Sequence, residues 1–337
     1  MRAERKKEHL ENYLRTGHEG NPLFSDIYIE HNALPLLSVD AVDPSTEFLG
    51  QKIGYPLMIN AMTGGGDFAL EINRQLADIA SNYRIPMAVG SQIIALELGK
   101  ESETSFRVVR EEMRDDQIVI ANVNANATPE EAARAVDMIR ANALQIHLNV
   151  AQELVMEEGD RDFSGVLDHM KAIRDAIGVP VIVKETGTGI SGAVAKRLVE
   201  EGFQFIDVSG TGGTNFIEIE NLRTLERDFS ELYGWGIPTA KALINVREQA
   251  PDACIIGSGG VRSSMDIVKA LIIGADITAA SGEILSFLVH GGPDYAKQHL
   301  DDQFYKLRAL MVMLGAKNIQ ELKNVPYKVT GRLKGIL

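Results

Sequence analysis

The sequence is short of cysteine, of basic residues and of long apolar runs, and each shortage excludes a class of protein. Its single cysteine, Cys254, rules out an intrachain disulfide and a cysteine-rich metal cluster, and in an expected buried strand it should be inert. With 34 Lys and Arg against 47 Asp and Glu, the net charge of −13 argues against general nucleic-acid binding. The apolar stretches fall far below the roughly 20 residues of a membrane span, and residues 1–10 are too charged for a secretory signal. We therefore expect a cytoplasmic protein that binds neither membranes nor nucleic acid.

What the chain does contain is a repeated alternation of short apolar runs and longer amphipathic segments from Tyr55 onward. The expected strands are Pro56–Asn60, Pro86–Val89, Ile118–Asn122, Ala143–Leu148, Val179–Lys184, Phe205–Ser209, Ala253–Gly257 and Ile277–Ala280. The expected helices are Phe68–Tyr83, Ser102–Met113, Pro129–Asn142, Phe163–Ile177, Ala193–Glu201, Pro238–Gln249 and Ser264–Ile273. Because parallel strands need helical crossovers, eight such units favour an α/β fold that closes into a (β/α)8 TIM barrel. An open, doubly wound sheet is the alternative.

Two segments fall outside this repeat. Residues 1–54 form a charged extension in which few strands are expected, and we interpret it as an N-terminal arm. The segment Gly210–Ile237, after the sixth strand, is longer than the usual loop of about two to six residues. Long loops of this kind often serve as lids or binding loops. No linker divides the chain, so residues 55–337 are predicted to form a single barrel domain.

The expected C-terminal ends of the strands all carry glycine or polar residues, and barrel active sites lie at these ends. The most specific of them is Gly257–Arg262, which follows the seventh strand and leads into a helix. Its glycines let backbone N–H groups approach an anion, the helix N-terminus adds a favourable dipole, and Arg262 adds positive charge. Ala280 and Ser281, after the eighth strand, supply the second wall of this predicted phosphate site. A plain glycine turn is the alternative.

Other strand ends carry groups that suit a flavin. Lys184 ends the fifth strand, where a structural lysine would have to bury its charge. It is suited to stabilise negative charge on the N1–C2=O edge of a flavin, and a solvated lysine is the alternative. The uncharged hydrogen-bonding residues at strand ends are Thr63, Ser91, Asn122, Ser209 and Thr214. They suit the rim of a flavin ring or a ribityl chain, although each could instead be an ordinary cap.

A second ligand is indicated by one carboxylate and one basic cluster. Glu153 follows the fourth strand, where His147 and Asn149 share a face by the period of two. Mg²⁺ often uses a single carboxylate when substrate phosphates supply other ligands, so Glu153 is either a metal ligand or a helix cap. The cluster Arg5–His9 is either a solvated tail or, in this acidic protein, a clamp for a diphosphate.

Taken in order, these motifs resemble those of the type 2, flavin-dependent isopentenyl-diphosphate isomerases over nearly the whole chain. The shared motifs are Arg5-Lys6-x-Glu8-His9, Asn60–Gly65, Val89–Ser91, His147-Leu148-Asn149-x-x-Gln152-Glu153, Val183–Glu185, Gly210–Thr214 and Gly257–Gly260. The ordered set is specific, whereas its glycine motifs alone would indicate only an FMN barrel.

The resemblance implies an enzyme of isoprenoid biosynthesis that interconverts isopentenyl and dimethylallyl diphosphate, uses reduced FMN, Mg²⁺ and NADPH or NADH, and forms homo-oligomers. The implied FMN residues are Met62, Thr63, Gly64, Ser91, Asn122, Lys184, Ser209, Thr214, Ser258, Gly259, Gly260, Ala280 and Ser281. The implied substrate residues are Arg5, Lys6 and His9 of the N-terminal arm, with His147, Asn149 and Gln152. Of these, His147 and Gln152 are also candidate catalytic residues, and Glu153 is the implied Mg²⁺ ligand. Ordinary side-chain acids protonate an unactivated alkene badly, so the N5 atom of the reduced flavin is the expected acid and base.

Three features depart from the family pattern or leave a role open. An arginine usually follows closely after Ser91, where this chain reads Gln92–Ile94, and Phe216 stands where a tryptophan is frequent. Glu220 aligns with a family glutamate that is a candidate catalytic proton relay, or it lies on a solvated helix face.

Two other functions compete with the isomerase interpretation. An FMN-dependent oxidoreductase of the 2-hydroxy acid oxidase type would use the same barrel with a histidine base and arginines for a small carboxylate. Arg262 is already assigned to phosphate, however, and no His-Arg pair ends another expected strand. A non-catalytic flavin-binding module is the third interpretation, and the polar residues at every strand end argue against it.

Overall fold

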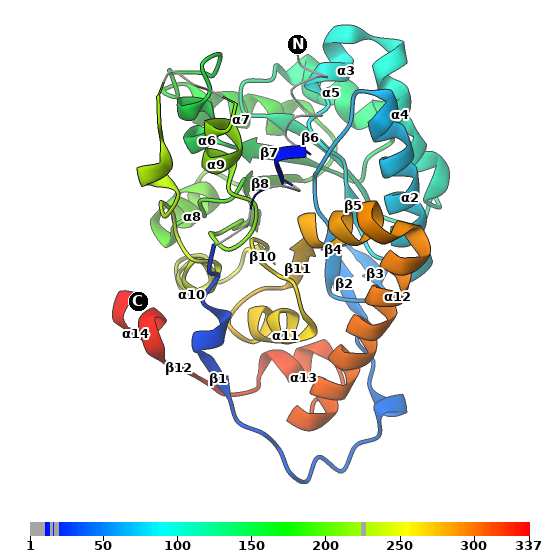
Figure 1. Ribbon diagram of the computed structural model, residues 1–337, viewed down its shortest axis with the longest axis vertical. Helices are drawn as coiled ribbons and strands as arrows, with labels where there is room; N and C mark the ends of the chain where they lie inside the picture. Colours follow the sequence, from blue (N-terminus) through cyan, green and yellow to red (C-terminus); the bar gives the residue numbers. More distant parts are fainter. Residues whose placement is uncertain (1–10, 14–15, 17–19, 224–226) are drawn as a thin grey trace.

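Eight parallel strands close into a barrel that helices surround, as Figure 1 shows. The computed structural model describes residues 11–13, 16, 20–223 and 227–337. The barrel strands are β4 (Leu57–Ile59), β5 (Met87–Ala88), β6 (Val119–Asn124), β7 (Ala143–Leu148), β8 (Val181–Glu185), β9 (Phe205–Asp207), β10 (Cys254–Gly257) and β11 (Ile277–Ala280). Their order in space is β10-β11-β4-β5-β6-β7-β8-β9, so the predicted TIM barrel is confirmed and the open-sheet alternative is wrong.

Helices connect the strands, and each predicted helix is present with shifted ends. The longer helices are α2 (Asp67–Tyr83), α4 (Lys100–Glu112), α5 (Pro129–Met138), α7 (Val166–Ala176), α8 (Gly192–Glu200), α10 (Thr239–Gln249), α11 (Ser264–Ile272) and α12 (Gly282–Leu314). The start of α5 follows from the local sequence, because Thr128 and Glu131 form a reciprocal capping box and Pro129 occupies the first turn. Helix α12 was not among the predicted helices, and it bends at Gly292, where φ is 80° and Pro293 follows. None of the helices in the described residues is both long and apolar enough to cross a membrane.

Shorter helices were not predicted, because five or six residues carry too little periodicity to be recognised. They are α3 (Ile93–Leu98), α6 (Val150–Val155), α9 (Phe216–Asn221), α13 (Ile319–Lys323) and α14 (Gly331–Ile336). Helix α9 lies within the long segment Gly210–Ile237, and the Asn215 side chain caps it by accepting from the Ile217 N–H at 3.2 Å. It packs beside α6, so the long segment reaches over one side of the barrel mouth.

Residues 1–54 contain few strand residues, as expected, in three short strands that were not predicted individually. Strand β1 (Ile27–Ile29) pairs antiparallel with β12 (Tyr327–Val329), near the other end of the chain. Strands β2 (Thr46–Phe48) and β3 (Gln51–Ile53) form an antiparallel hairpin. Strands of three residues show no readable alternation, and the partner of β1 is brought to it only by the tertiary fold.

The inside of the barrel is apolar at its lower end, where the strands begin, and polar near its mouth. At the lower end Phe48 and Ile53 of the β2–β3 hairpin pack with Ile118 and Ile277, and Phe48 meets Phe205 edge to face at 6.5 Å. Inward-facing residues recur every two positions along a strand. The inward residues nearest the mouth are Asn60, Asn122, Gln145, Lys184, Asp207 and Ser258, and all of them are buried. A hydrophobic plug therefore closes one end of the barrel, and a polar layer forms the floor of the other.

Cys254, at the start of β10, lies beside the plug. Burial raises the pKa of its thiol to about 12, and the nearby Asp276 carboxylate acts in the same direction. The thiol therefore stays protonated at neutral pH, as an inert packing residue would.

Candidate active site

Two adjoining cavities of about 310 and 130 Å³ open above the polar layer. The wall residues that they share include Tyr13, Lys184, Thr214, Phe216 and Ser281. The larger cavity extends over the ends of β6 and β7 toward α6 and α9. The smaller one lies among the loops that follow β9, β10 and β11. This two-part shape suits an elongated ligand with a second molecule beside it.

Backbone rather than side chains forms much of the smaller cavity. Gly259 and Gly260 have positive φ values of 97° and 82°, which only glycine adopts without strain. They also lie against the loop after β9, since a Cβ atom on Gly260 would come within 2.5 Å of the Gly212 carbonyl oxygen. The predicted phosphate residues that line this cavity are Ser258, Gly259, Gly260, Arg262, Ala280 and Ser281. The structure therefore brings these residues together around one cavity, whereas Gly257 lies outside its lining.

One part of the phosphate prediction needs correction, namely the helix that would face the anion. At the start of α11, the Asp266 carboxylate accepts from the backbone N–H groups of Arg262 and Ser263, at 3.1 and 2.9 Å. This side chain already caps that helix. Helix α12 begins at Gly282, which lines the cavity together with Ser281. The first turn of α12, rather than that of α11, therefore faces the candidate anion site.

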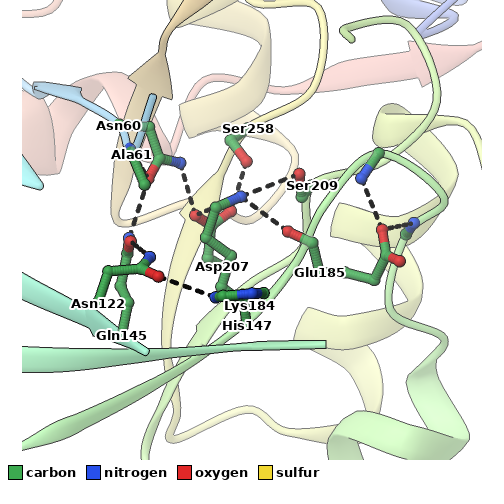
Figure 2. Close-up of polar contacts among 12 residues, drawn as sticks. Asn60, Ala61, Asn122, Gln145, His147, Lys184, Glu185, Asp207, Ser209 and Ser258 are labelled. Carbon is green, nitrogen blue, oxygen red and sulfur yellow. Dashed lines mark hydrogen bonds and ion pairs between the residues drawn. The ribbon is translucent and has the colours of Figure 1, made fainter. Parts of the chain in front are cut away.

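Lys184 is buried beneath both cavities, with 7% of its surface exposed, so the solvated alternative is wrong. Its Nζ donates to the Glu185 carbonyl oxygen at 2.7 Å and to Ser209 Oγ at 3.2 Å. It also lies 3.7 Å from Oδ2 of the fully buried Asp207, which accepts a hydrogen bond from Ser258 Oγ. Figure 2 shows Lys184 of β8 and Asp207 of β9 close to Ser209 and Ser258, which follow β9 and β10. The ammonium is thus held by fixed partners directly under the mouth.

The predicted ring-binding and ribityl-binding residues, with one exception, line the two cavities. Those in the walls are Met62, Thr63, Ser91, Asn122, Lys184, Ser209 and Thr214. Gly64 is not among the lining residues, and a Cβ atom there would come within 2.1 Å of the Phe106 ring. Thr63 Oγ1 is buried and finds no hydrogen-bond partner in the described part of the chain. Buried hydroxyl groups are normally bonded, so this one is available to a ligand.

A chain of side-chain amides crosses the polar layer from Asp207 to the rim (Figure 2). Asn60 donates to Asp207 Oδ2 at 2.7 Å and accepts from Gln145 at 2.9 Å. Gln145 in turn accepts from Asn122 at 2.9 Å, and Asn122 Oδ1 lies 2.8 Å from His147 Nδ1. Sequence reasoning gave no role to Asn60, Gln145 or Asp207. The available signal was a polar residue at an inward position of an otherwise apolar strand.

Gln152 lines the larger cavity, and its side chain is bonded to Glu220, which lies behind the cavity wall. The Gln152 Nε2 donates to Glu220 Oε1 at 2.6 Å, which joins α6 to α9. Glu220 is 1% exposed and forms an ion pair with Arg223, which also reaches Glu158 at 3.2 Å. The alternative that Glu220 lies on a solvated helix face is therefore wrong.

Glu153 lies in the wall of the larger cavity, together with Glu158 and Asp160. Its Oε1 accepts from Asn149 Nδ2 at 2.8 Å, and its Oε2 accepts from the Asp160 N–H at 2.9 Å. The carboxylate therefore binds the loop that follows α6 and does not cap that helix. Among the described residues no cluster of three His, Cys, Asp or Glu side chains is arranged to hold a metal alone. A cation at Glu153 would need further ligands from a bound substrate or water.

The segment where the family usually has an arginine is apolar on its cavity side. Ile93 and Ile94 line the larger cavity, and Phe216 keeps an aromatic side chain in its wall. Gln92 is fully buried and turns away, because its Nε2 donates to the Ala135 carbonyl oxygen at 2.9 Å. Its Oε1 accepts from the Asn122 N–H at 3.0 Å, so this residue positions the end of β6.

The predicted diphosphate clamp, Arg5, Lys6 and His9, lies outside the described residues. The first described residues after it reach the site, since Tyr13 lines both cavities. Burial raises the pKa of the Tyr13 phenol to about 12, with a smaller contribution from the Glu283 carboxylate that Arg262 partly offsets. Tyr13 of the N-terminal arm therefore lies in the wall of the mouth.

Comparison with known proteins identifies relatives over nearly the full chain. Residues 104–327 match the family model of the FMN-dependent dehydrogenases. An isopentenyl-diphosphate delta-isomerase of Geobacillus sp. (strain WCH70) is 44% identical over 331 residues, which cover 98% of this chain and 94% of that protein. The enzyme of the same name from Bacillus pumilus (strain SAFR-032) is 42% identical over 331 residues, covering 98% and 92%.

Solved structures share the barrel at lower identity. A flavocytochrome b2 variant superposes with a TM-score of 0.70 at 17% identity, covering 98% of this chain and 84% of that one. The superposition shows that the two proteins share a fold. At this low identity it gives no information about activity.

Proposed function

Because this chain belongs to the type 2, FMN-dependent isopentenyl-diphosphate delta-isomerases, we propose that its barrel mouth interconverts isopentenyl and dimethylallyl diphosphate. The observation that carries the proposal is a glycine-backbone anion cradle that adjoins a larger cavity with polar and apolar walls. The cradle suits the phosphate of FMN, and the larger cavity suits an alkenyl diphosphate beside the flavin ring.

The residues of the mouth fit FMN. The glycine loops and the first turn of α12 suit its phosphate. The Thr63 Oγ1, which has no partner among the residues that the structure describes, suits a polar atom of the cofactor. Lys184 holds a positive charge where the electron-rich edge of a reduced ring would be stabilised. When bound, reduced FMN supplies at its N5 atom an acid and base for an unactivated alkene. The side chains of this chain bind, orient and shield the substrate.

The apolar wall of the larger cavity suits the hydrocarbon part of the substrate. Its members include Met62, Ile93, Ile219 and Leu285. They exclude water from a carbon skeleton that becomes cation-like when the alkene gains a proton. On the polar wall we assign His147, Asn149 and Gln152 to substrate binding, with His147, Gln152 and Glu220 as the candidate proton-handling set. Glu220 holds Gln152 in place through the 2.6 Å hydrogen bond.

The diphosphate requires a counter-charge, because the larger cavity also carries the carboxylates of Glu153, Glu158 and Asp160. Mg²⁺ bound by Glu153 and by substrate phosphate oxygens would remove this repulsion. We assign Arg5, Lys6 and His9 of the N-terminal arm to the same diphosphate. NADPH or NADH is the proposed reductant of the flavin.

The deciding experiment incubates the FMN-loaded protein, reduced under anaerobic conditions, with isopentenyl diphosphate in the presence and absence of Mg²⁺. We expect dimethylallyl diphosphate to form only when Mg²⁺ is present. The same preparation is also given 2-hydroxy acids. An unchanged diphosphate would refute the isomerase assignment, and oxidation of a 2-hydroxy acid would favour the oxidoreductase instead.

The metal assignment has its own test. Glu153→Gln should lose most activity and its response to Mg²⁺, because a neutral amide binds this ion far more weakly than a carboxylate. Glu157→Gln is the matched control, since this exposed residue lies outside both cavities and should keep normal Mg²⁺ dependence. Normal activity in Glu153→Gln would remove Glu153 from the metal site.

We further propose that the enzyme is a cytoplasmic homo-oligomer, built from a single barrel domain of residues 55–337 and an arm of residues 1–54 that contributes to the substrate site. Light scattering of the purified protein measures the oligomeric state directly, and a monomeric mass would contradict this part of the proposal.

A further inference from the structure

The carboxylate of Asp207 lies at the floor of the mouth and is joined to His147 at the rim by three buried amides (Figure 2). We propose that this chain of hydrogen bonds fixes the tautomer of His147, so that Nδ1 carries the proton and Nε2 is the acceptor toward the substrate. Asp207, Asn60, Gln145 and Asn122 are then positioning residues. The inference rests on the proposed function only for the role of His147, since the tautomer follows from the hydrogen bonds alone.

The chain has a fixed polarity because both contacts that orient Asn60 can be made in only one way. Asn60 Nδ2 lies 2.7 Å from Oδ2 of Asp207, and an ionised carboxylate can only accept. Asn60 Oδ1 lies 2.9 Å from the backbone nitrogen of Ala61, and this N–H can only donate. Reversing the Asn60 amide would place oxygen against oxygen on one side and N–H against N–H on the other. The two contacts fix its orientation independently of each other.

The orientations of the next two amides follow from that of Asn60. Asn60 Oδ1 must receive a donor from Gln145, so the Nε2 of Gln145 faces it at 2.9 Å and the Oε1 of Gln145 faces Asn122. That oxygen in turn requires a donor, which is the Nδ2 of Asn122 at 2.9 Å. All three residues are at most 2% exposed, so water cannot replace a mismatched partner.

The last contact determines the state of the imidazole. With its Nδ2 turned to Gln145, Asn122 presents Oδ1 to His147 Nδ1 at 2.8 Å, and an amide oxygen has no hydrogen to donate. The hydrogen in this contact must therefore lie on Nδ1. Asn122 cannot shift to avoid it, because Gln92 binds its backbone N–H and carbonyl oxygen at 3.0 and 2.8 Å.

The fixed tautomer limits what His147 can do. A neutral ring with its proton on Nδ1 has a lone pair on Nε2, so it accepts from donors such as metal-bound water or a cationic side chain. It can donate to a phosphate oxygen from Nε2 only after gaining a second proton. The buried carboxylate that lies beside Lys184 thus also sets the hydrogen-bonding role of a residue on the substrate side of the mouth.

The tautomer is measured by ¹⁵N NMR of the FMN-loaded protein labelled at histidine, at a pH where the His147 ring is neutral. The His147 signals are assigned by their loss in His147→Gln. We expect Nδ1 to have the chemical shift of a protonated nitrogen and Nε2 that of an unprotonated one. The opposite pattern would overturn the inference. Isomerase activity does not enter this measurement, so the expected tautomer in a protein that fails to isomerise the diphosphate would leave this inference intact and refute only the proposed function.

A variant tests whether the amides are the cause. Gln145→Leu removes the central link, and we expect the His147 signals to move toward a mixture of tautomers, with kcat/KM reduced at least tenfold. Gln117→Leu is the matched control, because Gln117 is also buried, and it bonds Ser81 away from both cavities. It should keep the wild-type His147 signals. Unchanged signals in Gln145→Leu would refute the role of the amides, and if that variant does not fold, the wild-type spectrum still decides the tautomer.

Discussion

The lower end of the barrel is closed by apolar side chains, whereas its mouth is floored by charged groups and amides. At the lower end, Phe48 and Ile53 come from a hairpin outside the barrel and fill its interior. At the mouth, Lys184 and Asp207 are also buried but are held by specific hydrogen bonds. The same barrel therefore has one end stabilised by burial of apolar surface and another organised by polar geometry.

This contrast separates stability from ligand binding. The lower end touches neither cavity, so changes there should alter the free energy of unfolding and leave FMN affinity unchanged. The glycine loops and Thr63 lie in the walls of the mouth, so changes there should alter FMN affinity more than stability. In TIM barrels generally, function is built on the loops at one face and stability depends on the other.

The largest effect on stability is expected from removing a large side chain of the hydrophobic plug. Phe48→Ala should lower the free energy of unfolding by about 3–5 kcal/mol, because it removes a fully packed ring from the barrel interior. Denaturant titration measures this, and FMN titration at low temperature should give wild-type affinity. Tyr305→Ala, at an aromatic residue that is 63% exposed, is the control and should change stability little. A plug variant that stays folded but loses FMN would break the separation of the two ends.

The ion pairs at the lower end give a pH-dependent effect. Burial alone would raise the pKa of Asp276, but the hydrogen bond and charge of Lys323, the Ile255 N–H and Arg247 together lower it. A depressed folded-state pKa adds stability above the unfolded value of about 4, and this stability is lost as the pH falls through the folded value. Asp276→Asn should therefore cost about 2 kcal/mol at pH 7, with a difference from wild type that shrinks below about pH 4. Denaturant titrations at the two pH values test this, and a constant difference would contradict it.

The backbone at Gly259 and Gly260, which forms the candidate anion site, should be sensitive to the addition of a single methyl group. Gly260→Ala places a Cβ atom 2.5 Å from the Gly212 carbonyl oxygen, which forces two loops apart. Overpacking of this kind costs about 1–3 kcal/mol, so we expect FMN affinity to fall roughly tenfold or more. Gly99→Ala is the matched control, because its φ of 83° is nearly the same as the 82° of Gly260 and no atom of the described residues lies within 4 Å of the added atom. An equal loss of FMN affinity in both variants would show that backbone strain alone, and not the contact with Gly212, causes the effect.

The smallest effect is expected at Thr63. Thr63→Val removes a buried hydroxyl that has no partner in the described residues, so the protein without FMN should gain up to about 1 kcal/mol of stability. FMN affinity should fall about fivefold, which is the loss of one modest hydrogen bond. In the control Thr278→Val, the lost hydroxyl donates to the Pro56 carbonyl oxygen at 2.6 Å, so stability should fall. Thermal unfolding with and without FMN distinguishes the two, and a loss of stability in both would show that Thr63 is already satisfied.

Much of the barrel could be predicted from the sequence, because each strand and helix carries its own local pattern. The strands Ala143–Leu148 and Ile277–Ala280 were predicted to the residue. The glycine loop at Gly257–Arg262 was likewise readable, since glycine, a strand and a helix follow one another directly. The short strand β1 was not, because its partner β12 lies near the other end of the chain.

Local sequence patterns account for the alternation of strands and helices, the side of the barrel that carries polar loops, and the residue types available there. How those residues combine depends on the folded arrangement of the strands and helices. This arrangement buries Glu220 and joins it to Gln152, it turns Asp266 onto the start of α11, and it links Asp207 to His147 through three amides. Local patterns report the direction a side chain takes from its own strand or helix. Hydrogen-bond partners from different strands depend on how the sheet closes, and this depends on contacts between residues far apart in the chain.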